Sequence, residues 1–75
     1  MTRLPQLTAR ELISFLSKHH FESIRQKGSH LTLWHPVLRL AVTIPVHPGR
    51  TLGRGLAVRI LKDAGFTVDD FLADR

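Results

Sequence analysis

The feature that most constrains the fold is a pair of short alternating segments between residues 29 and 44. In an extended chain, successive side chains point to opposite sides. In residues 29–35 one side therefore carries Ser29, Leu31 and Leu33, and the other carries His30, Thr32 and Trp34. Residues 40–44 alternate again, with Leu40, Val42 and Ile44 on the apolar side, and Pro36 and Pro45 close the two segments. Residues 21–26 are typical of a further short strand, followed by a turn at Lys27 and Gly28. Three strands with hairpin-length links predict an antiparallel meander with one buried face.

Helix signals flank these strands on both sides. Thr8 and Glu11 fit a capping box, and Leu7 and Leu12 stand at the positions of a hydrophobic staple, which predicts a helix over residues 9–19. Lys18, His19 and His20 would fall in its last turn. Residues 1–6 are expected to be an unstructured lead-in.

The second helix is predicted over residues 54–64, after a turn-rich loop at 46–53. Gly65 suits the position just after a helix, from which Phe66 can fold back on Leu61. Thr67 would cap a last helical turn that reaches residue 72. The expected fold is α+β with the order α-β-β-β-α, in which two helices cover one face of a three-stranded antiparallel sheet.

Length and composition set the broad class. Seventy-five residues make a single domain, 1–75, and such small domains often depend on a partner for stability. The chain has no cysteine, no apolar run near the roughly 20 residues of a membrane helix and no signal-peptide core. We therefore expect a cytoplasmic protein that does not enter a membrane.

The charge is strongly positive, with eleven Lys and Arg against six Asp and Glu and a net charge of +5. Most of the cations are arginines, whose planar head matches two oxygens of a phosphate. This balance favours a polyanionic partner, either RNA or DNA or an acidic protein. A merely basic domain with no such partner remains an alternative.

Several kinds of site are not favoured by the spacing of the polar residues. The acids do not cluster as a two-metal nuclease requires, and Asp69 and Asp70 point apart as helix neighbours. A zinc site would need His30, His35 and His47 to converge, but the first two have opposite strand parity. Ser29 and His30 cannot form a dyad for the same reason. The segment GRTLGRG lacks the spacing of a phosphate-binding loop. No metal or other cofactor is expected.

The histidines differ in their surroundings. His19 and His20 fit the end of a helix, and His35, before Pro36, fits a turn. His47 lies near Arg50 in a loop, where it fits a turn residue and a phosphate contact equally well.

His30 is expected on the sheet face without helices, beside Thr32 and Trp34, with Arg25, Ala41 and Thr43 across the sheet. A Trp on such a face suits either a protein partner or a stacking platform for a base. Spacing alone still favours an ordinary solvated histidine at position 30.

Over about residues 5–72 the chain resembles HicA, the toxin family of bacterial HicAB toxin–antitoxin modules. The resemblance runs through Leu7, Glu11 and Leu12, the Gly28-Ser29-His30 motif, residues 44–47 and residues 54–65. It departs at Leu31, where relatives often carry a polar residue, and at Leu56, where they often carry Ser or Thr.

The resemblance implies an mRNA interferase of double-stranded-RNA-binding-domain-like fold, in which His30 is the catalytic residue. It also implies a HicB-like antitoxin that covers the face of His30. We expect the RNA to contact the following residues: Arg25, Lys27, Ser29, Trp34, Arg39, His47, Arg50 and Arg54. The alternatives are a non-catalytic RNA-binding module or a protein-interaction domain of the same fold.

Overall fold

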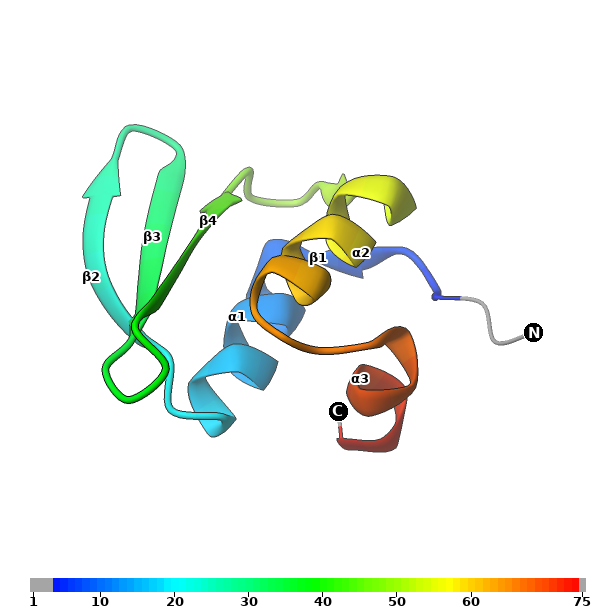
Figure 1. The fold of residues 1–75 in the computed structure, drawn as a ribbon. Helices are drawn as coiled ribbons and strands as arrows, with labels where there is room; N and C mark the ends of the chain where they lie inside the picture. The colour runs from blue at the N-terminus through cyan, green and yellow to red at the C-terminus, as the bar shows by residue number, and fades with distance from the viewer. Residues whose placement is uncertain (1–3, 75) are drawn as a thin grey trace.

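A computed structural model describes residues 4–74 of the chain. The centre of the fold is a three-stranded antiparallel sheet. Its strands are β2 (Glu22–Lys27), β3 (His30–His35) and β4 (Leu40–Pro45), in the order β2-β3-β4. Helices α1 (Ala9–Lys18) and α2 (Arg54–Asp63) lie together on one side of this sheet (Figure 1). The predicted α+β class and α-β-β-β-α layout are therefore confirmed, with ends that differ from the predicted ones by one residue.

Three short elements extend this layout. Strands β1 (Leu7–Thr8) and β5 (Thr51–Leu52) pair antiparallel, with Leu7 opposite Leu52 and Thr8 opposite Thr51. The pair ties the start of α1 to the segment just before α2. Helix α3 (Val68–Asp74) then extends the predicted last turn by two residues. The sequence predicted a plain loop at residues 46–53, so the strand pair is an addition to the expected fold.

The predicted helix ends are present in detail. The Thr8 hydroxyl accepts the Glu11 backbone N–H at 3.2 Å, and the Thr8 N–H donates to the Glu11 carboxylate at 3.1 Å. At the end of α2, Gly65 has φ +90°, and the Phe66 N–H donates to the Leu61 carbonyl at 2.8 Å. This is the bond of a Schellman ending. Each cap pairs backbone groups that the helix itself leaves free.

Helix α3 is capped and tied to α1. The Thr67 hydroxyl accepts the Asp70 N–H at 3.1 Å. His19, at the C-cap of α1, lies with its Nε2 2.7 Å from the Asp74 carboxylate, and its ring packs at a tilt against Phe15 and Phe66. The prediction that His19 is a helix-end residue is confirmed, and its ring also joins the first helix to the last.

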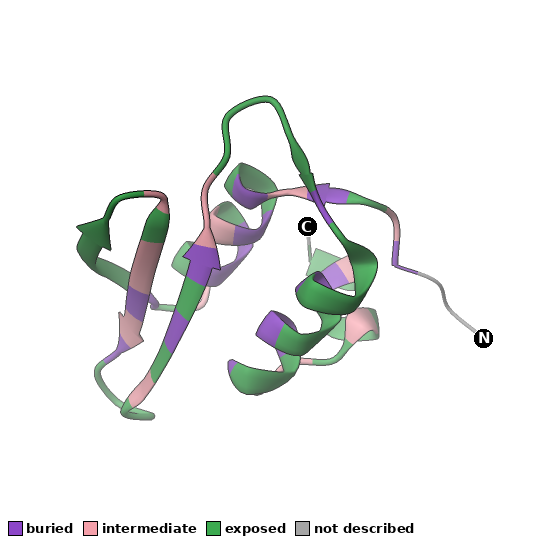
Figure 2. Cartoon of the chain, turned by 90° about the horizontal axis from the view of Figure 1, so that it is seen from above, coloured by how far each residue is buried: buried purple, intermediate pink, exposed green. Residues whose placement is uncertain are grey.

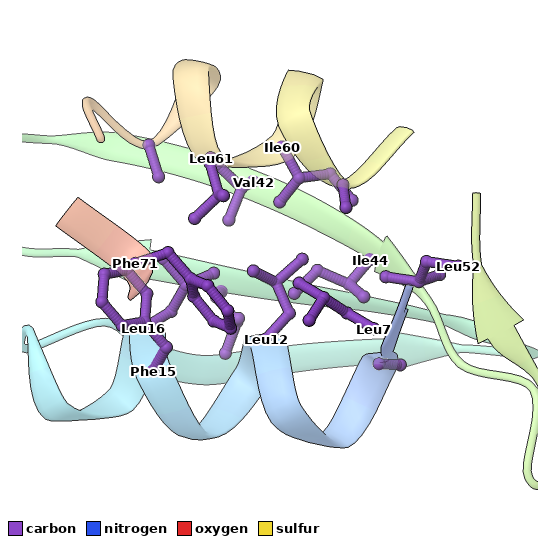
Figure 3. Packing of buried hydrophobic residues seen from close by; sticks show 14 of the residues in the cluster. Leu7, Leu12, Phe15, Leu16, Val42, Ile44, Leu52, Ile60, Leu61 and Phe71 are labelled. Carbon is purple, nitrogen blue, oxygen red and sulfur yellow. The ribbon is translucent and has the colours of Figure 1, made fainter. Parts of the chain in front are cut away.

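The core lies between the two main helices and the sheet (Figure 3). Its largest fully buried side chains are Phe15, Phe71, Leu7, Leu12, Leu16, Leu33, Ile44 and Leu61. Leu4 is also buried there, so the expectation of an unstructured lead-in is wrong for this residue. Residues 5 and 6 belong to no helix or strand, and residues 1–3 lie outside the described part of the chain.

Strand β2 is the exposed edge of the sheet. All six of its residues are exposed (Figure 2). Its pairing with β3 shifts by one residue between Ser23 and Arg25, which marks a bulge at Ile24. The bulge changes the parity of the residues before it, so that Glu22, rather than Ser23, is paired with Trp34 and shares its face.

Candidate functional site

The turn between β2 and β3 fixes the position of His30. Lys27 and His30 are paired residues, so the connection contains only Gly28 and Ser29. Gly28 has φ +59° and no positive φ occurs at Ser29, which matches the type II′ hairpin turn with glycine first. The turn therefore lies at Gly28 and Ser29, one residue later than predicted, and its tight geometry sets Lys27 directly across from His30.

His30 lies on the sheet face that the helices leave uncovered, which we call the open face. Residues paired across an antiparallel sheet share a face, so the register defines three rows on it. The rows are Lys27, His30 and Pro45; Arg25, Thr32 and Thr43; and Glu22, Trp34 and Ala41. The predicted company of His30, Thr32 and Trp34 with Arg25, Ala41 and Thr43 is thus confirmed.

Positive charge gathers at the His30 end of the open face. His30, Lys27 and Arg25 are all exposed. Lys27 lies in the row of His30, and Arg25 lies in the next row. The acid among these three rows, Glu22, lies in the row of Trp34. Trp34 is four residues from His30 along β3, or about 13 Å at ~3.3 Å per residue. Among the three rows, an anion at the imidazole would therefore meet the cations Lys27 and Arg25, and the one carboxylate lies at the far end.

His35 belongs to the opposite side of the same strand. It is only 7% exposed, and its ring packs edge-on against Phe21 with centroids 5.1 Å apart. Its Nδ1 accepts the backbone N–H of Leu38 at 3.0 Å. His35 ends β3 rather than standing in the turn, so the expectation of a plain turn residue is wrong. The prediction that His35 faces the side of β3 opposite to His30 is confirmed, and its contacts are those of a structural residue.

The loop after β4 brings His47 and Arg50 near α1. Arg50 N–H donates to the His47 carbonyl at 3.0 Å, with Pro48 and Gly49 between them and Gly49 at φ +77°. These are the features of a type II turn, with proline second and a left-handed residue third. The turn and the first turn of α1 enclose a pocket of about 480 Å³, whose lining also includes Arg10. Arg10 was missed from the sequence, because only the β1–β5 pairing brings it to this loop.

The remaining predicted RNA contacts are dispersed. Arg39 lies in the β3–β4 turn with φ +57°, beyond the end of β3 opposite to His30. Arg54, at the first position of α2, donates its Nε–H to the Leu4 carbonyl at 2.8 Å, so part of its guanidinium is already engaged. Ser29 lies in the hairpin turn, where its carbonyl accepts the Val46 N–H at 2.6 Å. The predicted residues therefore divide into a group at the His30 end and an outlying group formed by Arg39, Trp34 and Arg54.

Within residues 4–74, no three His, Asp or Glu side chains are grouped so as to hold a metal ion. The helices of the same part of the chain are all too short or too polar to cross a membrane.

Fold and site together define a small basic α+β protein with one uncovered sheet face, on which an exposed histidine stands among cations. A family model described as "HicA toxin of bacterial toxin-antitoxin" matches residues 9–66, which span every element from α1 to α2. The chain therefore belongs to the HicA toxin family, and membership implies a toxin's role and an antitoxin partner. No curated protein and no solved structure matched significantly, so the double-stranded-RNA-binding-domain-like label stays a prediction.

Proposed function

We propose that this HicA-family chain is an endoribonuclease that cleaves mRNA with His30 as its catalytic residue and is inhibited by a HicB-like antitoxin. The observation that carries the proposal is the place of His30, exposed on the open face and paired directly with Lys27. Action on mRNA would place the protein in the cytoplasm, and halted translation would be the basis of its toxicity.

His30 would act as the general base. The 2′-hydroxyl of RNA is a poor nucleophile until its proton is removed as it attacks the adjacent phosphorus. An imidazole has a pKa of about 6.5 in water, so its neutral form can take that proton near neutral pH. A bond then forms between the 2′-oxygen and phosphorus, and the bond from phosphorus to the 5′-oxygen breaks. The 5′-oxygen takes a proton from water, which leaves a 2′,3′-cyclic phosphate on one product.

Lys27 and Arg25 would stabilise the transition state. The phosphorus carries additional negative charge on its oxygens as the 2′-oxygen attacks, and positioned cations lower the energy of that state most. Lys27 is the cross-strand partner of His30, and Arg25 lies in the next row of the same face. We assign charge stabilisation to these side chains rather than to a metal ion, because the carboxylate in the three rows, Glu22, lies at the far row.

The antitoxin would cover the open face. Trp34 is half-buried on this face although no helix packs there, and the opposite face is already occupied by α1 and α2. A partner bound over His30, Thr32 and Trp34 would bury the aromatic ring and would also block access of RNA to the imidazole.

The test in cells is growth arrest on controlled expression. The wild-type chain is expected to arrest growth at low expression, and co-expression of an antitoxin encoded beside it is expected to restore growth. The His30→Ala variant, at the same protein level, is expected to be harmless. Arrest by His30→Ala equal to that by the wild type would favour a binding module over an enzyme and would overturn the proposal.

A further inference from the structure

The pocket of about 480 Å³ beside the sheet is built by segments distant in sequence. One wall is the start of α1 with its N-cap, residues 8–10, and the other is Val46 with the type II turn at residues 47–50. The β1–β5 pair holds the walls together, because Thr8 pairs with Thr51, the residue after Arg50. The capping box at Thr8 and the proline and glycine of the turn fix both walls before any ligand arrives.

The lining combines cations with an apolar wall. The cations are Arg10 and Arg50, His47 lies beside them, and none of the lining residues within 4–74 is acidic. The nearby Glu11 carboxylate is engaged by the Thr8 N–H and hydroxyl. Ala9, Val46 and Pro48 supply the apolar surface. Small-molecule sites of roughly 300–1,000 Å³ have this character, mostly apolar with a few placed polar groups. This lining suits a ligand that is apolar on one part and anionic on another, and a nucleotide is such a ligand.

The pocket adjoins the candidate active site. Pro45 is the cross-strand partner of His30 on one side, and Val46, the next residue, lines the pocket. The Val46 N–H donates to the carbonyl of Ser29, the residue before His30, at 2.6 Å. The end of the sheet at His30 and the Val46 side of the pocket are therefore held together by a strand pair and a hydrogen bond.

We propose that this pocket holds a flanking nucleotide of the RNA strand that is cleaved at His30. Arg10 and Arg50 bind its phosphate, and its base lies against Val46 and Pro48. The strand passes from the open face around the end of the sheet into the pocket. This inference rests on the proposed function, since it takes the same RNA as ligand. The site lies off the open face and so gives the protein a hold on RNA separate from the catalytic histidine.

The experiment measures binding of short RNA oligonucleotides of increasing length to the His30→Ala protein, which cannot cleave them under the proposed mechanism. Arg10→Gln and Arg50→Gln are each expected to weaken binding of a hexanucleotide by roughly two- to fivefold, the upper part of the range for one exposed charge pair. Both variants are expected to weaken binding of a dinucleotide less, because its one phosphate cannot lie at His30 and in the pocket at the same time. Arg59→Gln, which removes an exposed charge from α2, is the matched control and is expected to change neither affinity.

Amide NMR spectra locate the ligand directly. The hexanucleotide is expected to shift the amides of Arg10 and Gly49 together with those of Thr32 and Thr43. Hexanucleotide binding with shifts confined to the open face, or equal losses in Arg10→Gln and Arg59→Gln, overturns the pocket and leaves the proposed function standing. A protein that binds neither oligonucleotide overturns both.

Discussion

Replacement of His35 by alanine is expected to destabilise the protein by about 2–3 kcal/mol. The side chain is 7% exposed, packs on Phe21 and accepts the Leu38 N–H at 3.0 Å. Loss of such a hydrogen bond costs about 1 kcal/mol. Loss of the packed ring adds roughly 1–2 kcal/mol, less than the ~3–5 kcal/mol for a buried Phe, because imidazole is smaller and polar.

This loss is large for a chain of 75 residues. At about 0.05–0.15 kcal/mol per residue, its whole stability is on the order of 4–11 kcal/mol. Each kcal/mol shifts the thermal unfolding midpoint of a domain of this size by roughly 4–8 °C, so His35→Ala is expected to lower that midpoint by about 8–24 °C. His35→Phe keeps an aromatic ring against Phe21 and loses the acceptor, and it is expected to show about 1 kcal/mol of the loss.

Thermal unfolding followed by circular dichroism measures both variants against His30→Ala. His30 is exposed on the same strand, so its removal is expected to change stability by less than about 0.5 kcal/mol. Equal destabilisation by His30→Ala and His35→Ala would refute the division of β3 into a structural histidine and an exposed one. A midpoint of His35→Ala within the error of the wild type would refute the burial argument.

Further results are expected from the same structure. RNA binding by the His30→Ala protein is expected to weaken as salt is raised, and log K is expected to fall by roughly 0.7 per phosphate contact for each tenfold increase in salt. An affinity that does not change with salt would exclude the phosphate contacts. Trp34→Ala is expected to weaken the antitoxin complex more than Leu56→Ala does, and Leu56, an exposed apolar residue on α2, serves as the control. Trp34 fluorescence that does not change when the antitoxin binds would exclude the open face as the antitoxin's binding surface. Gly65→Ala is expected to lower the free energy of unfolding by about 1–2 kcal/mol. The cost comes from the φ of +90° alone, since the added methyl group meets nothing within 4 Å, and an unchanged denaturant midpoint would contradict it.

The parts of the fold that could be predicted from sequence are those set by local chemistry. The Thr8–Glu11 box and the Gly65 ending involve residues a few positions apart, and the alternation of β3 separates its two faces without knowledge of the rest. For the same reason the open-face position of His30 followed from parity alone. The assignment of its catalytic role came instead from the resemblance to HicA.

The parts that could not be predicted depend on contacts between distant segments. A two-residue pair such as β1–β5 leaves almost no pattern, and it forms because Leu7 and Leu52 are both buried in the same core. Arg10 and the pocket follow from that pair, and were therefore missed. His35 looked like a turn residue because Pro36 follows it, whereas burial of its face of β3 determined its position. The bulge at Ile24 likewise depends on the register with β3.

The most direct test of the central claim is cleavage of a defined single-stranded RNA by purified wild-type and His30→Ala proteins, with the products' ends identified by mass. Removal of a positioned proton-transfer group costs about 10²–10⁴-fold in rate, so the variant is expected to lose at least the lower value while it folds and binds RNA as the wild type does. The wild type is expected to cleave in EDTA and to leave 2′,3′-cyclic phosphate ends. A folded His30→Ala protein that cleaves at the wild-type rate would contradict the account.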